Sequence, residues 1–256
     1  MTKPADTHSA MSKRAVILAG GKGSRLAPYT TVIPKPLLPI GDRAILDVIL
    51  RQLSAFGFTE LSLAVGYLSH LIKAVIGDGS DFGVCIDYHE EKVPLGTAGA
   101  LGLIEGLDEP FLVMNGDVLT TLDYRALYDA HVSEGNALTI ATHRRVVKTD
   151  YGVLHLDGEA GALRRVRGFE EKPEIPYVVS MGVYVLDPSV LGLIRPEERV
   201  DVPELVLRLL SDGRRVGSYL YDGYWLDIGR HDDYVRATED YDSVVAQLPE
   251  LAKLDA

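Results

Sequence analysis

The feature that most constrains the fold is a glycine-rich turn that follows a short apolar run near the start of the chain. Residues 15–40 are AVILAGGKGSRLAPYTTVIPKPLLPI, and residues 15–18 predict a buried strand. Gly20, Gly21 and Gly23 follow in quick succession. Because glycine has no Cβ, backbone N–H groups in such a turn can approach an anion closely. The stretch therefore predicts a strand that leads directly into an anion-binding turn.

Two cationic side chains follow in the same loop. Arg25 offers a planar guanidinium that fits phosphate oxygens, and Lys35 offers a point charge. Pro34 and Pro36 flank Lys35 and limit the freedom of its backbone. The glycine turn and the two cations together predict a cradle for the phosphates of a nucleoside triphosphate.

Two better-known glycine motifs do not fit this loop. A Walker A loop needs Lys followed directly by Ser or Thr, but Gly23 separates Lys22 from Ser24. The dinucleotide fingerprint fits Gly21 and Gly23 and then requires a glycine where the chain has Leu26. A dinucleotide oxidoreductase is therefore only a distant alternative.

The loop resembles the signature of the sugar nucleotidyltransferases, L-A-G-G-x-G-[ST]-R-L followed by P-K-P, and the resemblance extends over residues 14–241. It implies that Arg25, Lys35 and, further along the chain, Lys172 act in catalysis. It also implies a set of nucleotide-binding residues in the turn: Leu18, Gly20, Gly21, Gly23 and Ser24.

Two aspartates are candidate metal ligands. Asp117 directly follows a predicted buried strand, and Asp227 lies among apolar residues in the run YWLDIG. A turn or capping role is the alternative for each. Both positions match metal-binding aspartates of the family, so the resemblance implies a Mg²⁺ ion held by two carboxylates and the triphosphate.

The segment around Glu91 is the candidate for reading the base. In the thymidylyl and uridylyl branches of the family, a glutamine precedes the glycine that corresponds to Gly96 by five residues. Here that position is Glu91, and a carboxylate has only acceptors. It suits the two adjacent donors of guanine, and residues 90–99 resemble those of mannose-1-phosphate guanylyltransferases. Gly96 and Thr97 are expected to bind nucleotide as well; the alternative is that Glu90 and Glu91 are a solvated pair.

Further motifs imply a sugar-phosphate site. By the resemblance, Lys172 binds the phosphate of a sugar 1-phosphate, Glu171 accepts sugar hydroxyls, and the Gly152 backbone lies against the sugar ring. An ordinary surface ion pair is the alternative for Glu171 and Lys172. Ser180 stands where the family usually has an asparagine that faces the sugar. This departure leaves a hexose, a heptose or a cyclitol phosphate open as acceptor.

Strand and helix patterns alternate through the first half, which predicts an α/β fold with a doubly wound, mostly parallel, Rossmann-like sheet. The resemblance implies a glycosyltransferase-A-like arrangement with a sugar-binding extension packed on the nucleotide half. We expect one domain over residues 13–256, with a nucleotide half at about 13–145, a sugar-binding half at about 146–245, and a disordered tail over residues 1–12. Both Met1 and Met11 are candidate translation starts.

The predicted elements follow from apolar periodicity and turn residues. Strands are expected at 15–18, 61–65, 84–88, 110–114, 137–142, 151–156, 163–169 and 178–186. Helices are expected at 43–56, 67–76, 97–107, 124–133, 202–210 and 231–241.

Composition narrows the function further. A net charge of −11 argues against a nucleic-acid surface, and no apolar run is long enough to span a membrane. Cys85 is the single cysteine, which suits a cytoplasmic protein, and we expect it to be a small core residue. The histidines show no metal-binding spacing. The oligomeric state stays open, a homo-oligomer included.

These patterns predict a magnesium-dependent transfer of GMP from GTP to a sugar 1-phosphate. One alternative is the same reaction with UTP, dTTP or CTP and a hexose 1-phosphate. An alternative from another class is a catalytically silent regulatory subunit that binds nucleotide sugars.

Overall fold

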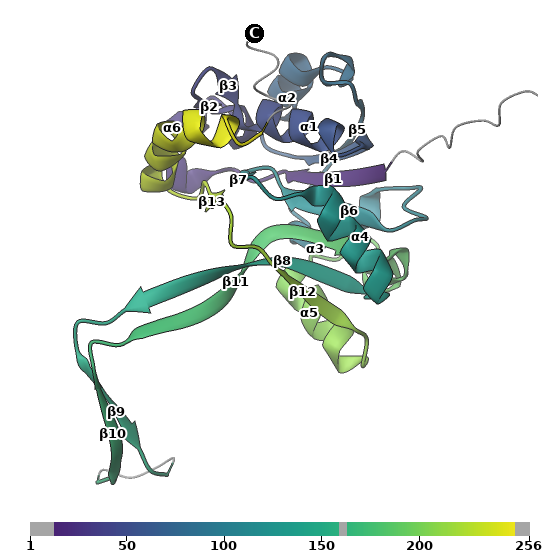
Figure 1. The fold of residues 1–256 in the computed structure, drawn as a ribbon. Helices are drawn as coiled ribbons and strands as arrows, with labels where there is room; N and C mark the ends of the chain where they lie inside the picture. Colours follow the sequence, from purple (N-terminus) through teal and green to yellow (C-terminus); the bar gives the residue numbers. More distant parts are fainter. Residues whose placement is uncertain (1–12, 159–162, 249–256) are drawn as a thin grey trace, which may run out of the picture.

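A computed structural model of the chain describes residues 13–158 and 163–248, and its centre is a seven-stranded sheet (Figure 1). The strand order is β12-β8-β11-β6-β1-β4-β5. The strands are β1 (Lys13–Ala19), β4 (Phe58–Val65), β5 (Cys85–Glu90), β6 (Phe111–Asn115), β8 (Leu138–Lys148), β11 (Glu174–Leu186) and β12 (Val216–Leu220). Only β11 runs antiparallel to its neighbours in this sheet. The predicted mostly parallel α/β fold is confirmed.

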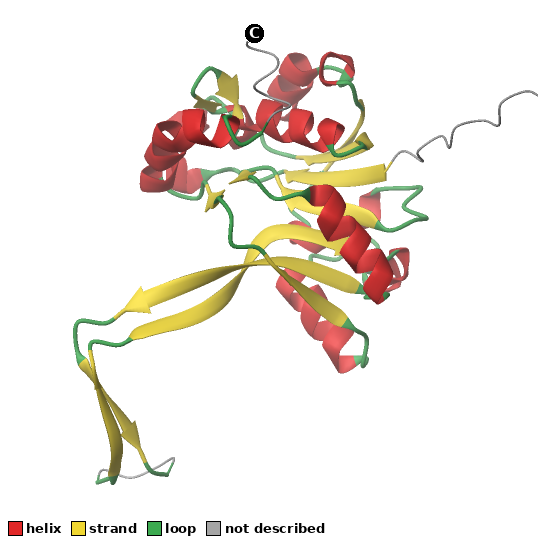
Figure 2. Ribbon diagram, viewed as in Figure 1, coloured by secondary structure: helices red, strands yellow, loops and turns green. Residues whose placement is uncertain are grey.

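Helices cover both faces of the sheet (Figure 2). They are α1 (Ile45–Ala55), α2 (Ser69–Ile76), α3 (Gly96–Gly99), α4 (Tyr124–Glu134), α5 (Val202–Ser211) and α6 (His231–Val245). Successive side chains of a strand point to opposite faces. Accordingly Ile17 of β1 lies in one apolar core with α1 and α6, whereas Val16 lies in the other with α3 and α5. Both side chains are fully buried.

The described chain also contains three two-stranded sheets. They are β2 (Pro39–Ile40) with β3 (Arg43–Ala44), β7 (Val118–Thr120) with β13 (Trp225–Asp227), and β9 (Gly152–Leu156) with β10 (Val166–Glu171). The β7–β13 pair matters for the site, because it joins the turn after β6 to the segment before α6. In the part of the chain that the structure describes, no helix has the length and apolarity needed to cross a membrane.

The helix predicted over residues 97–107 is much shorter than expected. Only Gly96–Gly99 is α-helical, and a 3₁₀ turn over Ala100–Leu103 follows. The segment contains three glycines, which are poor helix formers, and Gly106 takes a φ of 72°. The prediction that Cys85 is a core residue was also wrong, because its side chain at the start of the edge strand β5 is exposed. The predicted disordered tail, residues 1–12, lies outside the described residues.

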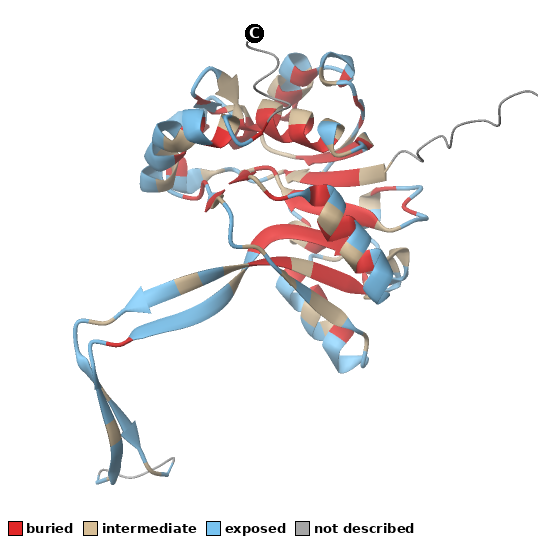
Figure 3. Ribbon diagram, in the orientation of Figure 1, coloured by how far each residue is buried: buried red, intermediate tan, exposed pale blue. Residues whose placement is uncertain are grey.

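The extension differs from the expected packing on the nucleotide half. Strands β8 and β11 continue beyond the central sheet as a two-stranded ribbon, and β9 with β10 extends it further (Figure 1). We call residues 143–180 the arm. Most of the arm is exposed, in contrast to the buried strands of the core (Figure 3).

Candidate active site

A cleft of about 310 Å³ lies where β1 and β6 end. The carboxyl ends of parallel strands are where α/β sheets bind ligands. Many of the predicted residues line this cleft together: Leu18, Gly21, Gly23, Ser24, Arg25, Lys35, Thr97 and Asp117. The structure therefore gathers the glycine turn, both cations and one of the aspartates around a single hollow.

The backbone of the turn is held in a conformation that requires glycine. Gly23 has a φ of 61°, and a Cβ there would lie 2.9 Å from the Thr30 Cγ2 atom. The Gly23 carbonyl accepts hydrogen bonds from the Leu26 N–H and the Thr30 hydroxyl, both at 2.8 Å. Ser24–Leu26 then forms a 3₁₀ turn that places Arg25 on the cleft wall.

Lys35 and Asp117 form an ion pair at the cleft. The Lys35 Nζ donates to Asp117 Oδ2, and Lys35 is only 8% exposed. The other oxygen, Asp117 Oδ1, is buried and has no hydrogen-bond partner among the described residues. A buried acceptor without a partner is costly unless a ligand or ion satisfies it.

Asp227 lies next to this pair because of the β7–β13 ladder. Asp227 is opposite Val118, and the Ile228 N–H donates to the Asp117 carbonyl at 3.0 Å. Partial burial and then the nearby Asp117 carboxylate raise the pKa of Asp227, while Lys35 and Arg25 oppose the shift. Two adjacent carboxylates that repel one another are a typical cation site.

The residues present fit a Mg²⁺ ion. Mg²⁺ in nucleotide enzymes is usually held by one or two carboxylates, substrate phosphates and water, so a larger protein ligand set is not needed. Within residues 13–158 and 163–248, no three or more His, Cys, Asp or Glu side chains are arranged so that they could hold a metal ion by themselves. The unpartnered Asp117 Oδ1 and the neighbouring Asp227 supply such a small set of oxygen ligands.

The two neighbouring glutamates have different surroundings. Glu90 accepts a hydrogen bond from the Ser69 hydroxyl and pairs with Lys73 at 3.5 Å, on the exposed side of β5. Glu91 is half-buried instead, and its Oε2 accepts the Leu95 N–H at 2.9 Å. Its Oε1 lies 2.5 Å from where a Cβ on Gly20 would stand, so Glu91 sits directly against the glycine turn. Only Glu90 fits the description of a solvated residue.

The segment that contains Gly96 and Thr97 is fixed by residues the sequence patterns did not indicate. Gly96 has a φ of 78°, and a Cβ there would lie 2.6 Å from the Val200 carbonyl oxygen. The Thr97 N–H and hydroxyl both donate to Asp201 Oδ1, at 3.0 and 3.3 Å. The Thr97 hydroxyl also accepts the Val202 N–H at 2.9 Å. Thr97 thus faces the cleft and anchors the start of α5 as well.

Asn115 is another residue that the sequence patterns missed. It lines the cleft at the end of β6, beside Gly116. A Cβ on Gly182 would lie 2.6 Å from Asn115 Nδ2, so the root of the arm packs against this side chain. The sequence does contain a feature that could have indicated Asn115, because this residue follows the predicted strand and immediately precedes Gly116 and Asp117.

Ser180 lies at the root of the arm, close to the core. Its hydroxyl donates to the Tyr184 hydroxyl at 3.0 Å and accepts the Gly182 N–H at 3.3 Å. The hydroxyl is therefore engaged within a local turn of β11.

Three predicted sugar-site residues lie together on the arm and do not line the cleft. Glu171 is directly opposite Gly152 in the β9–β10 ladder, and Lys172 follows with a φ of 48°. A Cβ on Gly152 would lie 2.3 Å from the Phe169 ring, so this glycine permits a close cross-strand contact. The arm carries them away from the core in this arrangement (Figure 1).

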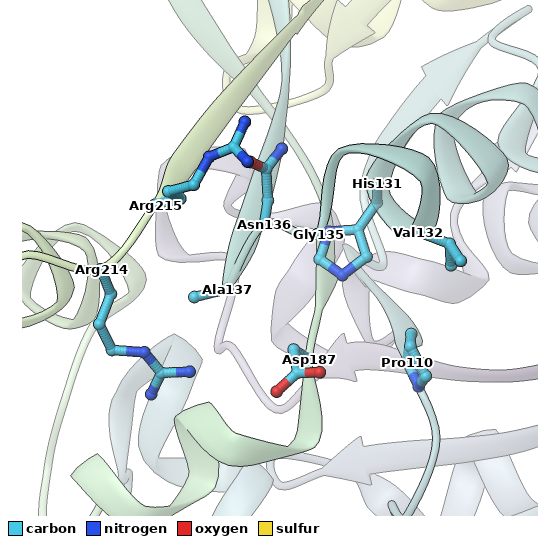
Figure 4. Close-up of a pocket in the computed structure, with 9 residues that line it drawn as sticks. All are labelled: Pro110, His131, Val132, Gly135, Asn136, Ala137, Asp187, Arg214 and Arg215. Carbon is cyan, nitrogen blue, oxygen red and sulfur yellow. The ribbon is translucent and has the colours of Figure 1, made fainter.

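A larger hollow, of about 430 Å³, lies at the opposite end of the sheet, between the end of α4 and the start of β8 (Figure 4). Its charged side chains already have protein partners. Arg214 and Asp187 both bind Ser189, and Arg215 pairs with Glu134 at 3.2 Å. None of the predicted site residues lines it.

Curated proteins resemble this chain over most of its length. Mannose-1-phosphate guanyltransferase from Candida albicans is 33% identical over 233 residues, which is 88% of this chain and 63% of that protein. Mannose-1-phosphate guanylyltransferase from Mycobacterium tuberculosis is 35% identical over 243 residues, which is 93% of this chain and 67% of that protein. The chain thus spans about two thirds of the length of these relatives.

A solved structure of HddC from Yersinia pseudotuberculosis superposes with a TM-score of 0.68 at 26% identity, covering 90% of this chain and 99% of that one. The same protein has also been solved in complex with GMP-PN, and that structure superposes with a TM-score of 0.66. The family model described as nucleotidyl transferase matches residues 14–244. This chain belongs to the nucleotidyl transferase family.

Proposed function

We propose that the protein transfers GMP from GTP to a sugar 1-phosphate, forming a GDP-sugar and pyrophosphate. An oxygen of the acceptor phosphate attacks the α-phosphorus of GTP, and a new P–O bond forms there. The bond between the α-phosphorus and the bridging oxygen breaks, and pyrophosphate leaves with that electron pair. Because the attacking oxygen is already anionic, no general base is required, and catalysis consists of positioning and charge stabilisation.

The position of Glu91 is the observation that supports guanine most directly. Its carboxylate is half-buried against Gly20, where the nucleotide loop begins. Carboxylate oxygens only accept, so they pair with the N1–H and N2–H₂ donors of guanine and repel the O4 of uracil or thymine. The names of the relatives, which are guanylyltransferases, agree with this assignment.

The cations of the cleft have distinct roles in this proposal. Backbone N–H groups of the glycine turn and the Arg25 guanidinium hold the triphosphate, and Lys35 offsets charge that grows on the phosphates in the transition state. Lys172 holds the acceptor phosphate against the same negative charge. Asp117 and Asp227 would hold Mg²⁺, which would neutralise triphosphate charge when bound.

The acceptor is proposed as a mannose-1-phosphate-like hexose, a heptose 1-phosphate or a cyclitol phosphate. The names of the relatives favour the first. Ser180 has a shorter side chain than the asparagine usual at this position. A heptose 1-phosphate and a cyclitol phosphate are therefore also candidate acceptors.

The test is pyrophosphate release with Mg²⁺ for each of GTP, UTP, dTTP, CTP and ATP against a panel of these acceptors. We expect a strong preference for GTP, and we expect Glu91→Gln to lose most of that preference while Glu90→Gln keeps it. The two glutamates are adjacent, but only Glu91 lies against the turn. A preference of the native protein for a pyrimidine nucleotide would overturn the base assignment. Nucleotide binding without release for any pair would favour the silent binding subunit instead.

A further inference from the structure

The arm is a two-stranded ribbon with little of its surface covered. From Thr142 opposite Ser180 to Lys148 opposite Glu174, β8 and β11 pair with each other, and β9 and β10 form a separate pair beyond them. Figures 1 and 3 show the ribbon projecting from the core, with most of its described residues exposed. Isolated two-stranded sheets are at best marginally stable in water, and their unpaired edges invite association.

The arm also exposes an unusual amount of apolar surface. Eleven large apolar side chains are exposed among its described residues: Val146, Val147, Tyr151, Leu154, Leu156, Leu163, Val166, Phe169, Ile175, Tyr177 and Val178. Several are cross-strand neighbours, for example Val147 with Ile175 and Leu154 with Phe169. Contiguous exposed apolar surface of this kind marks an interaction site.

The root of the arm sets its direction. Val183 and the residues after it pair with β6, whereas residues 174–180 pair with β8 only, and the register shifts between Ser180 and Tyr184. Met181 is buried at this bulge, and its carbonyl accepts the Trp225 indole N–H at 2.9 Å. Bulges bend a strand and increase its twist. The bulge therefore helps to set the direction in which the ribbon leaves the sheet, and no described residue of the ribbon lines the chain's own cleft.

The chemistry of the cleft is incomplete without the arm. On the proposed function, Glu171 and Lys172 bind the acceptor, yet no described residue of the arm lines the cleft. The ladder keeps Glu171 opposite Gly152, so these acceptor-binding residues form a preassembled unit on the arm. Glu171 and Lys172 can therefore act only at a cleft that lies within reach of the extended arm.

Charge favours a second copy of the chain as the partner. Residues 143–180 contain seven Lys and Arg against six Asp and Glu, whereas the whole chain has 26 against 37. The remainder of each copy is therefore strongly acidic and the arm is not. An arm docked on the core of another copy avoids the repulsion that two acidic cores would have in direct contact.

We propose that two copies of the chain exchange arms, so that each cleft receives Glu171 and Lys172 from the partner copy. Exchange of an identical element is a low-cost route to a dimer, because each copy satisfies the surface that the other leaves exposed. Each active site is then built from the cleft of one copy and the arm of the other. The exchange covers the apolar side chains and supplies the acceptor-binding residues in one step.

The decisive experiment is complementation between two defective copies. Asp117→Asn damages the cleft and Lys172→Ala damages the arm, and each homodimer is expected to be inactive. A heterodimer of the two, isolated through two different affinity tags, contains one intact site if arms are exchanged. It should therefore recover about half of the native rate per dimer. If each arm serves its own cleft, every site carries a lesion and no activity returns, which would overturn the proposal.

The matched control reverses the expected result. A copy with both Asp117→Asn and Lys172→Ala is paired with a native copy through the same two tags. With exchanged arms, both sites carry one lesion and the heterodimer is inactive. With arms in their own clefts, the native copy keeps one intact site and about half of the rate remains. The two heterodimers thus contain the same substitutions and give opposite outcomes.

A readout independent of activity separates this proposal from the proposed function. Light scattering should give about twice the 27.9 kDa mass of one chain, and Phe169→Ser with Val178→Ser should shift the protein to a folded monomer. In a Cys85→Ser background, Lys172→Cys on one tagged copy should cross-link to Lys22→Cys on the other. A native monomer, or cross-links only within one chain, would overturn arm exchange. Retained activity in both single variants would overturn the proposed function, while the mass and cross-links still test the exchange.

Discussion

Lys35 and Asp117 form a partly buried ion pair at the cleft although 82 residues separate them in the chain. The pair occupies Asp117 Oδ2 and leaves Oδ1 buried without a partner among the described residues. The lysine thus fixes the carboxylate in place and leaves one oxygen for a ligand. This geometry is what a cation between protein and triphosphate requires.

Asp117→Asn should therefore abolish most of the activity. An amide keeps the shape but removes the negative charge that holds the cation, and we expect kcat to fall by about 10²-fold or more, the size of losing one strong electrostatic contact. Pyrophosphate release measured against Mg²⁺ concentration checks this. Asp222→Asn, an exposed carboxylate in the loop before β13, is the control and should behave like the native protein. Equal Mg²⁺ dependence in both variants would remove Asp117 from the metal site.

Arg25→Ala should depress turnover severely while the fold stays intact. Arg25 lines the cleft, whereas the neighbouring Lys22 is exposed and does not. We expect a loss of about 10²–10³-fold in kcat for Arg25→Ala, as for other preorganised charge contacts to a transition state, and little change for Lys22→Ala. Steady-state kinetics together with circular dichroism decide the point. Near-normal turnover of Arg25→Ala would contradict the assignment of Arg25 as a triphosphate ligand.

Gly20→Ala should disturb base selection rather than folding. A Cβ on Gly20 would lie 2.5 Å from Glu91 Oε1, so the glutamate must move away from the turn. We expect a higher KM for GTP and weaker discrimination against UTP. Gly192→Ala is the matched control, because nothing lies within 4 Å of a Cβ there. Unchanged discrimination in Gly20→Ala would argue that Glu91 does not read the base.

Thr97→Val should lower stability. The hydroxyl accepts the Val202 N–H at 2.9 Å and donates to Asp201, so its loss leaves groups at the start of α5 without partners. We expect a loss of about 1–2 kcal/mol in the free energy of unfolding, the cost of an unsatisfied buried or half-buried donor. Urea unfolding measures it, and Thr97→Ser, which keeps the hydroxyl, should retain most of the stability. Equal stability of Val and Ser variants would contradict this role.

His131 should make stability fall in mild acid. Its side chain is 2% exposed, and burial lowers its pKa below the ordinary 6.5, although Asp187 opposes the shift. The folded state therefore holds the proton less well than the unfolded state. The stability that neutral His131 contributes is therefore complete above its pKa in the unfolded state. It is lost as the pH falls through that value toward the lower pKa of the folded state. Thermal unfolding between pH 7.5 and 5, roughly the range around an unperturbed histidine, should show a steeper loss for the native protein than for His131→Gln. Parallel profiles would exclude His131 as the titrating group.

Local sequence patterns were sufficient to predict most of the strands and helices of the core. The apolar run before Gly20 is β1, and the periodicity of residues 43–56 corresponds to α1. The position of Asp117 after a buried strand predicted that it faces the ligand cleft, which it lines. These features depend on side-chain alternation and on glycine conformations, which neighbouring residues alone can specify.

Other features depended on partners distant in the chain. Cys85 is exposed because β5 is the edge strand of the sheet, a property of strand order that no local pattern contains. Val200 and Asp201 hold the Gly96 turn from about a hundred residues away. Glu90 and Glu91 differ because Glu90 ends β5 beside Ser69 and Lys73 of α2, whereas Glu91 contacts Leu95 and Gly20.

The sequence by itself determined the family, the mostly parallel fold and most of the residues that line the cleft, because glycine turns, strand ends and flanking charges act through local geometry. Only the tertiary structure decided where Lys172 and Gly152 lie. Their motifs are local, but their distance from the cleft is set by the bulge between Ser180 and Tyr184 and by the ribbon that follows it. Long-range strand pairing, rather than residue identity, thus places the residues predicted to bind the acceptor on an arm that does not line the cleft.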